Sequence, residues 1–389
     1  MALSKSSFGS VATPRVFLDI VQYAKAIGYI KEFYMYNTRP SIGGDRYSPS
    51  AWDYNPAKVS TYVAVDDASE GDGVHYMNFS CRFGNYDATT DNRNFAQLIR
   101  RTNYFGVFGH NIQTCDTNYN RASFCCIGGV EQNSYPLAYT EIVGTPYSMG
   151  NGYSIVGIDK WDQSDSLYFE GLRATVWSDT DNDAHFAEET STVNIGTISA
   201  GLYMDFPHNT DLNLKINYNY DGVKSKNTIS GRTITNVNYH KAPDWGAYPK
   251  WTHVPQSTIT GGTHDDSTWL NAMDMKQVNA TGRRSWDLTF SYLSKSDTFN
   301  KSMEGNMFAH NMEENTAIES ADTPRFGLTK DNIVGTMMTL SLGGSIPFLF
   351  QPDNTKQEFA FVKLNQKKVS INQVAPELYS VKLKLIECW

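Results

Sequence analysis

Apolar and polar residues alternate along several short segments of this chain, most regularly near its last residue. There, Tyr379, Val381, Leu383 and Leu385 alternate with serine and lysine residues. A period of two is typical of a strand with one buried face. Because chain ends usually fray unless a sheet holds them, we expect this terminal strand to be a structural edge that joins an ordered assembly.

Similar patterns predict strands along most of the chain, separated by turns that contain glycine, asparagine and aspartate. The alternation is clear over Leu212–Tyr220 and over Ser285–Leu293. Residues 228–239 are expected to continue as a hairpin with its bend at Ser230 and Gly231. The strands expected in the N-terminal half are Ser60–Val65, Val74–Arg82, Asn103–Phe108, Ser154–Ile158, Leu167–Trp177 and Thr192–Phe206.

Two segments show helical spacing instead. The segment VFLDI and the residues after it place apolar side chains at helical spacing up to Gly28, although VFLDI can also form a strand that leads into a shorter helix. Residues 329–342 predict an amphipathic helix that ends at Gly343 and Gly344. The apolar residues of the first segment are Phe17, Ile20, Val21, Ala24 and Ile27.

These elements predict a mainly β fold with two β-sandwich-type domains. Residues 1–50 are expected to form an N-terminal arm and a short helix, and residues 51–205 a jelly-roll-like sandwich. Residues 206–389 are expected to form an α+β sandwich flanked by the helix near 329–342. A chain of 389 residues is long enough for two or three domains, each with its own core.

Composition supports short strands over long helices, because aromatic residues reach 13% while charged residues are only 19%. The formal net charge of −8 argues against a nucleic-acid partner, which requires a basic face. The N-terminal residues lack the apolar core of a signal peptide, and no apolar run is long enough for a membrane span. We therefore expect no membrane insertion and synthesis in a cytoplasm.

The five cysteines have no CxxC spacing, and their odd number does not suggest a disulfide framework. We expect reduced, mostly buried thiols. They are Cys81, Cys115, Cys125, Cys126 and Cys388.

Motifs for nucleotide binding, zinc-dependent hydrolysis and nucleophilic serine catalysis are missing from the sequence. The acidic run Asp179, Asp181 and Asp183 suggests a calcium loop, but Ala184 and Thr190 stand where an EF-hand needs glycine and glutamate. We interpret this run as a solvated turn.

Two histidines near possible ligands have ordinary explanations as well. His264 precedes Asp265 and Asp266 without a second spaced pair of ligands, which favours a polar loop. His110 follows a strand and is expected to hydrogen-bond at the strand end. We therefore predict no catalytic residues, no cofactor and no metal, and we predict that the protein is not an enzyme.

Aromatic residues offer a different kind of site. Trp245, Tyr248 and Trp251 lie in the proline-containing segment 241–253. Such residues can anchor a subunit interface, stack on sugars, or fold back onto their own domain. Together with Trp389, they are our candidate interface or glycan contacts.

Several segments of the sequence resemble virion structural proteins of tailed bacteriophages, of the distal-tail or tail-tip adaptor kind. They are GRRSWDLTFSYL at 282–293, GGSIPFLFQPD at 343–353 and residues 377–389. Residues 102–112 and 194–211 are similar to the discoidin-type jelly rolls of such proteins. The resemblance implies a tail-tube-like fold for residues 206–389 and brings no catalytic motif.

The resulting hypothesis is a non-enzymatic structural subunit of a bacteriophage tail. Its expected partners are copies of itself in a symmetric ring and other phage tail proteins, and its expected location is the virion. The alternative is a carbohydrate-binding, receptor-recognition protein of the virion that holds host-surface glycans. A glycan-degrading enzyme is a third possibility and would require two facing carboxylates.

Overall fold

The computed structural model describes most of the strand-forming segments of the chain. The described residues are 13–36, 38–40, 49–54, 60–64, 74–83, 102–110, 120–128, 133–141, 152–157, 169–179, 192–219, 223–237, 283–298, 333–355 and 359–388. The predicted mainly β fold is confirmed, because strands dominate and helices are few and short in a sandwich-like architecture.

The largest sheet has ten strands and is antiparallel at every pairing. In hydrogen-bonding order, its strands are β13 (Lys215–Asn219), β16 (Arg283–Ser294), β20 (Leu378–Glu387), β18 (Ala360–Leu364), β17 (Phe348–Gln351), β1 (Arg15–Asp19), β12 (Thr197–Asp205), β6 (Tyr104–His110) and β9 (Gly152–Gly157), and β19 (Ile371–Ala375) lies beside β20.

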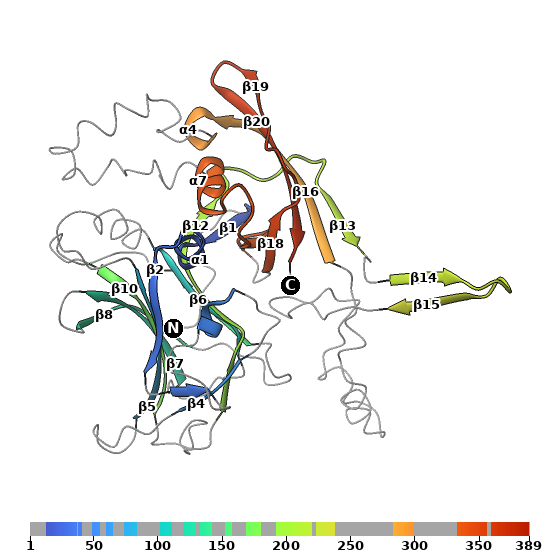
Figure 1. Cartoon of the computed structure of the whole chain (residues 1–389). Helices are drawn as coiled ribbons and strands as arrows, with labels where there is room; N and C mark the ends of the chain where they lie inside the picture. The colour runs from blue at the N-terminus through green and yellow to red at the C-terminus, as the bar shows by residue number, and fades with distance from the viewer. Residues whose placement is uncertain are drawn as a thin grey trace, which may run out of the picture.

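Three smaller sheets complete the described strands. A five-stranded sheet has the order β2 (Ile30–Tyr36), β5 (Val74–Phe83), β10 (Phe169–Asp179), β7 (Asn120–Gly128) and β8 (Asn133–Glu141). A three-stranded sheet has the order β11 (Thr192–Ile195), β4 (Ser60–Ala64) and β3 (Thr38–Pro40). The last is a hairpin of β14 (Val223–Asn227) and β15 (Thr233–Val237), which extends away from the rest of the molecule in Figure 1.

Strand β1 lies in the middle of the largest sheet, between β12 and β17. All five of its residues are buried. Val16 and Leu18 belong to the main apolar core, and Phe17 belongs to a second core on the other face. Burial on both faces explains why VFLDI lacks the alternation of a half-buried strand, and it confirms the alternative of a strand followed by a short helix.

One sheet of the structure contains strands from both sides of the boundaries predicted at 50/51 and 205/206. The segment at 15–19 bridges strands from both expected sandwich domains, so one sheet crosses both boundaries. The main core does the same, because Phe79 and Leu172 belong to the same cluster as Phe290 and Leu383. The physical reason is that the two backbone edges of β1 pair with one strand from each half, β12 and β17. The domain boundaries themselves stay predictions.

The helices begin and end where local chemistry permits. Helix α1 (Ile20–Ala26) is capped by Asp19, whose side chain accepts a hydrogen bond from the backbone N–H of Gln22. Helix α7 (Ile333–Leu340) confirms the helix predicted over 329–342. It ends before Gly343 and Gly344, whose φ angles of 68° and 88° favour glycine.

The three C-terminal segments, at 282–293, 343–353 and 377–389, contribute to one sheet, as the sequence predicts. Their strands β16, β17 and β20 all belong to it. The prediction of a structural edge at the terminal strand is wrong. One side of β20 pairs with β16, and the other side pairs with β18 and β19. Alternation reports one buried face and does not reveal how many strands pair with the backbone. Trp389 lies outside the described residues.

Strands β7 and β8 are absent from the sequence-based predictions. Pro136 lies within β8, and proline disfavours a strand because it lacks the N–H donor. The pairing of β7 with β8 shifts its register between Phe124 and Cys125, where Cys125 faces Pro136. This bulge accommodates the proline within a paired strand.

Candidate assembly surface

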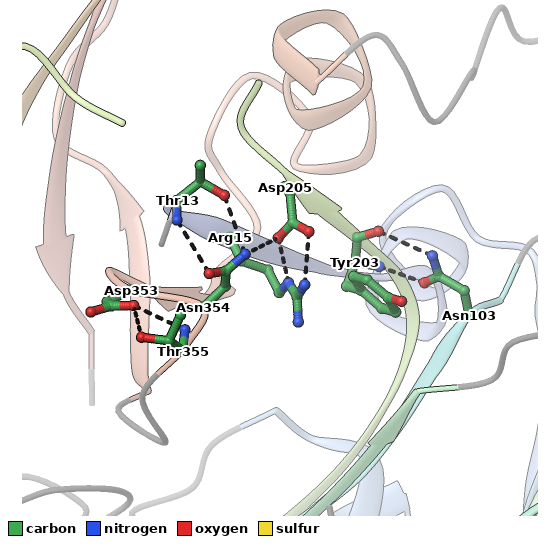
Figure 2. Close-up of polar contacts among 8 residues, drawn as sticks. All are labelled: Thr13, Arg15, Asn103, Tyr203, Asp205, Asp353, Asn354 and Thr355. Carbon is green, nitrogen blue, oxygen red and sulfur yellow. Dashed lines mark hydrogen bonds and ion pairs between the residues drawn. The ribbon is translucent and has the colours of Figure 1, made fainter. Parts of the chain in front are cut away.

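A polar network around Arg15 holds β1 between the two halves of the largest sheet (Figure 2). Arg15 donates from Nε and Nη2 to the two carboxylate oxygens of Asp205, at 2.5 and 2.7 Å. The guanidinium carbon also lies 4.6 Å from the centre of the Tyr203 ring. This bidentate ion pair is a strong, directional contact between neighbouring strands.

The same network reaches the turn after β17. The backbone N–H of Thr13 donates to Oδ1 of Asn354 at 3.2 Å, and Nδ2 of Asn354 donates to Oγ1 of Thr13 at 3.2 Å. Nδ2 of Asn354 also contacts Oδ1 of Asp205 at 3.4 Å. Thr355 donates from N and Oγ1 to Asp353, which fixes the turn that carries Asn354 (Figure 2). Contacts between residues 341 positions apart therefore set the sheet order at its centre.

Another carboxylate, that of Asp19, is completely buried near the N-terminus of α1. It accepts hydrogen bonds from the backbone N–H groups of Gln22 and Ala200, at 2.8 and 3.3 Å. Burial raises the pKa of Asp19 to about 6, although these hydrogen bonds act to lower it. Nearby, Tyr104 Oη and Ser199 Oγ are 2.7 Å apart. With its oxygens used by two backbone elements, Asp19 has a structural role in joining α1 to β12.

At one end of the largest sheet, β13 pairs with β16 and is the terminal strand in the sheet order. Ile216 is the register partner of Trp286, so both side chains lie on the same face. Trp286 is 2% exposed and packs against Phe350, whereas Ile216 is 49% exposed. The apolar face of the sheet thus continues from the core to an exposed strand.

We call four exposed apolar residues along this end of the sheet the edge stripe. The edge stripe consists of Leu212, Leu214, Ile216 and Tyr218. The sequence predicts a half-buried strand over Leu212–Tyr220, and the structure corrects this in two ways. The strand begins at Lys215, and its apolar residues Ile216 and Tyr218 are exposed at this end of the sheet.

Hydrogen bonds fix the start of the edge stripe against β16. Asp211 Oδ2 accepts from Ser291 Oγ at 2.7 Å, and the backbone N–H of Asp211 donates to the carbonyl of Thr289 at 2.8 Å. These contacts lie beside the bulge that shifts the register of β16 between Phe290 and Leu293. Leu212 is therefore held in place by its neighbour while its own side chain is fully exposed.

The second exposed feature is the projecting hairpin, residues 223–237. Among the described strands, β14 and β15 pair only with each other. From Lys224 to Thr235 every side chain except that of Thr228 is exposed. The predicted bend at Ser230 and Gly231 is confirmed, with Gly231 at a φ of 79°. An isolated two-stranded hairpin is marginally stable in water, so this element gains from contact with another surface.

The projecting hairpin also differs in charge from the whole chain. It contains Lys224, Lys226 and Arg232 and no acidic residue, whereas the chain carries a formal net charge of −8. Both lysines lie on β14, and β15 has no charged residue. One edge of the hairpin is therefore cationic and the other is neutral.

The predicted site residues Trp245, Tyr248, Trp251 and Trp389 lie outside the described residues, so their role as interface or glycan contacts stays a prediction. The same holds for His264–Asp266 and for Asp181 and Asp183. The described surface features are instead the edge stripe and the projecting hairpin. In the sequence, the edge stripe corresponds to the alternation over 212–220, and the hairpin corresponds to a segment with two lysines before a glycine bend. Neither pattern shows whether the side chains are exposed.

The described part of the chain was also searched for metal-ligating groups, membrane-spanning helices and free cysteines. There, no group of three metal-ligating residues is found, and no helix has the length and apolar character to cross a bilayer. Cys81 and Cys388 are free thiols, as predicted. Burial raises the pKa of Cys388 to about 11, so its thiol is protonated at neutral pH.

Comparisons with known proteins do not assign the chain to a family. No protein-family model and no curated protein match it. Among solved structures, the family 32 carbohydrate-binding module of C. perfringens NanJ, solved in complex with galactose, matches with 13% identity and a TM-score of 0.22. The match covers 45% of this chain and 98% of the module. A likeness this low carries no argument about the function of this chain.

Proposed function

We propose that this protein is a non-enzymatic structural subunit that assembles with copies of itself, and that the assembly is part of a bacteriophage tail. The observation that carries the proposal is the projecting hairpin, with exposed Ile229 and Ile234 and no strand partner outside the hairpin among the described residues. A monomer gains little from such an element, whereas a subunit of an assembly can use it as a contact.

The buried ionisable groups support a structural role. Asp19 joins α1 to β12, and Arg15 with Asp205 joins β1 to β12. Arg284 forms an ion pair with Glu387 at 2.6 Å and thereby joins β16 to β20 near the edge stripe. Each of these contacts connects two neighbouring strands, or a strand and a helix. This arrangement favours a structural role for these residues.

More specifically, we propose that the assembly is a ring in a bacteriophage tail. The support is the resemblance of residues 282–293, 343–353 and 377–389 to tail proteins. In such a ring, the hairpin of each copy would contact the next copy, which is a head-to-tail interface. The other tail proteins would then bind surfaces that this contact leaves free.

The test compares the full chain with a variant in which residues 223–237 are replaced by a short glycine-serine linker. We expect the full chain to form oligomers by light scattering and mass photometry, and the variant to be monomeric. Because the hairpin pairs with no other described strand, the variant should remain folded by circular dichroism, and it should lose only the stabilisation that assembly gives to the full chain. A full chain that stays monomeric at every concentration would refute the proposal. Cryo-electron microscopy of the particle then tests its place in a tail.

A further inference from the structure

We infer that a cationic surface of the largest sheet binds an acidic segment of a second copy of the chain. This surface, which we call the lysine face, consists of Lys215, Lys363, Lys382 and Lys384. The acidic segment is residues 179–189. The inference rests on the proposed self-assembly and adds a second contact to that of the projecting hairpin.

The lysine face lies on the side of the sheet opposite the main apolar core. On β16 and β20, Trp286 and Leu385 are register partners, and both belong to that core. Because successive side chains of a strand point to opposite faces, the neighbouring pair of Asp287 and Lys384 lies on the outer side. On β13, Lys215 is the register partner of Asp287 and shares this side.

The other two lysines extend the same surface. Lys382 lies two positions before Lys384 on β20, on the same side and about 7 Å away. Lys363 is the register partner of Ile386, and its two neighbours on β18 belong to the main core. The outer side of the sheet therefore carries lysines from three strands.

These lysines are available to a partner. All four side chains are exposed, and none of them forms an ion pair with another residue in the described part of the chain. Two more exposed lysines, Lys367 and Lys368, follow Gln366. The Gln366 side chain donates to the carbonyl of Lys382 at 3.2 Å and accepts from the N–H of Lys384 at 3.0 Å. These bonds hold the two additional lysines close to the lysine face.

The chain itself contains a complementary charge. Its formal net charge is −8 despite these lysines. Residues 179–189 include five acidic residues and no lysine or arginine, which is more acidic residues than any other stretch of eleven residues contains. Opposite charges that meet across an interface steer association and fix its register. The acidic residues are Asp179, Asp181, Asp183, Glu188 and Glu189.

The spacing of these acidic residues also matches the lysine face. The three aspartates occupy every second position, as Lys382 and Lys384 do on β20. In an extended chain, every second side chain points to the same side at a repeat of about 7 Å. An extended acidic segment along β20 would therefore place carboxylates opposite both lysines. Within this segment, Asp179 belongs to the described residues.

The positions of the two surfaces favour a contact between copies. Asp179 ends β10 in the five-stranded sheet, which lies on the left in Figure 1, whereas β13 and β16 lie on the right. The lysine face of one copy can therefore bind the acidic segment of the next. Such a head-to-tail contact can close a ring.

The projecting hairpin is the competing cationic surface, since Lys224 and Lys226 have the same spacing on β14. The lysine face is favoured because its strands belong to a large sheet with a packed core on the other side. Among the described strands, those of the hairpin pair only with each other. A rigid surface loses less conformational entropy when it binds a partner.

A charge exchange between two variants tests this contact. The first variant, Lys363→Glu with Lys382→Glu, makes the lysine face acidic. The second variant, Asp181→Lys with Asp183→Lys, makes the acidic segment basic. We expect each variant alone to raise the dissociation constant of the assembly at least tenfold, as measured by mass photometry across a concentration series.

Mixing the two variants should restore assembly. In the mixture, the acidic face of one variant meets the basic segment of the other, and the remaining face and segment keep their native charges. We expect the dissociation constant to return to within about fivefold of that of the unmodified chain. Recovery requires two different copies, so a segment that binds its own chain would give no recovery and would overturn the inference.

A conservative variant separates charge from packing. Lys363→Arg with Lys382→Arg keeps both charges, so we expect it to assemble with a dissociation constant within about twofold of the unmodified value. Lys384 is left unchanged in every variant, because a glutamate there would oppose Asp287 with a like charge. Circular dichroism of each variant verifies that it is folded.

A hairpin variant tests the competing surface. Lys224→Glu with Lys226→Glu makes β14 acidic and is mixed with the variant that has the basic segment. We expect no recovery of assembly in this mixture. Recovery equal to that of the first mixture would assign the acidic segment to the hairpin and overturn the inference.

The outcomes separate this contact from the proposed self-assembly. If the lysine-face variant and the segment variant both assemble like the unmodified chain, the contact is refuted and self-assembly stands. A full chain that stays monomeric at every concentration would refute both. If the lysine-face variant assembles normally but no longer binds dextran sulfate that the unmodified chain retains, the face belongs to an acidic polysaccharide and the inference fails.

Discussion

The ion pair between Arg15 and Asp205 should show a marked asymmetry when each partner is removed. In Asp205→Asn, the guanidinium of Arg15 loses the Asp205 carboxylate while its side chain stays buried, at 1% exposure. In Arg15→Met, the remaining Asp205 carboxylate is 37% exposed and can be hydrated. The cost of each change therefore depends on the group left behind.

Removing one partner of a fully buried pair costs about 3–5 kcal/mol. The partial exposure of Asp205 screens this pair, so we expect about 2–3 kcal/mol for Asp205→Asn. For Arg15→Met we expect about 1 kcal/mol, because methionine keeps much of the buried stem and only the paired charge and the Tyr203 contact are lost. The double variant should cost about the same as Arg15→Met alone, since no unpaired cation then remains buried.

Equilibrium unfolding in urea at neutral pH measures all three free energies. Lys25→Met is the control, because Lys25 pairs with Asp53 while their side chains are 39% and 30% exposed. Exposed pairs of this kind contribute below about 1 kcal/mol. If Arg15→Met destabilises the protein as much as Asp205→Asn, the argument from the buried guanidinium is wrong.

Two further predictions follow from the centre of the sheet. Burial raises the pKa of Asp19 to about 6, so the folded state binds this proton more tightly than the unfolded chain; the free energy of unfolding should fall as the pH rises from about 4 to about 6, and Asp19→Asn should flatten this slope in urea titrations. Gly201→Ala should destabilise the protein by more than about 3 kcal/mol, because the new Cβ would lie 2.0 Å from the carbonyl oxygen of Leu18. Gly28→Ala is its control: with no atom within 4 Å and a φ of 74°, it should cost only about 1–2 kcal/mol of backbone strain by thermal or urea unfolding, and equal costs would contradict the steric argument.

The helices and most paired strands could be predicted because their patterns are local. The helix over 333–340 shows apolar periodicity followed by two glycines, and β16 and β20 alternate at a period of two. The candidate site was harder to predict. The alternation over 212–220 is equally compatible with a covered strand and an exposed edge, so it gave no sign that Ile216 would be 49% exposed.

By itself, the sequence determined that this is a mainly β protein, where many of its regular elements lie, and that its C-terminal segments share one sheet. Only the tertiary structure decided that β1 is central, that β20 is paired on both sides and that β13 is the last strand in the order of the described sheet. The reason is that periodicity records the burial of side chains within a segment, whereas sheet order depends on backbone pairing between distant segments. Thr13 and Asn354 meet across 341 positions, and no local pattern contains that contact.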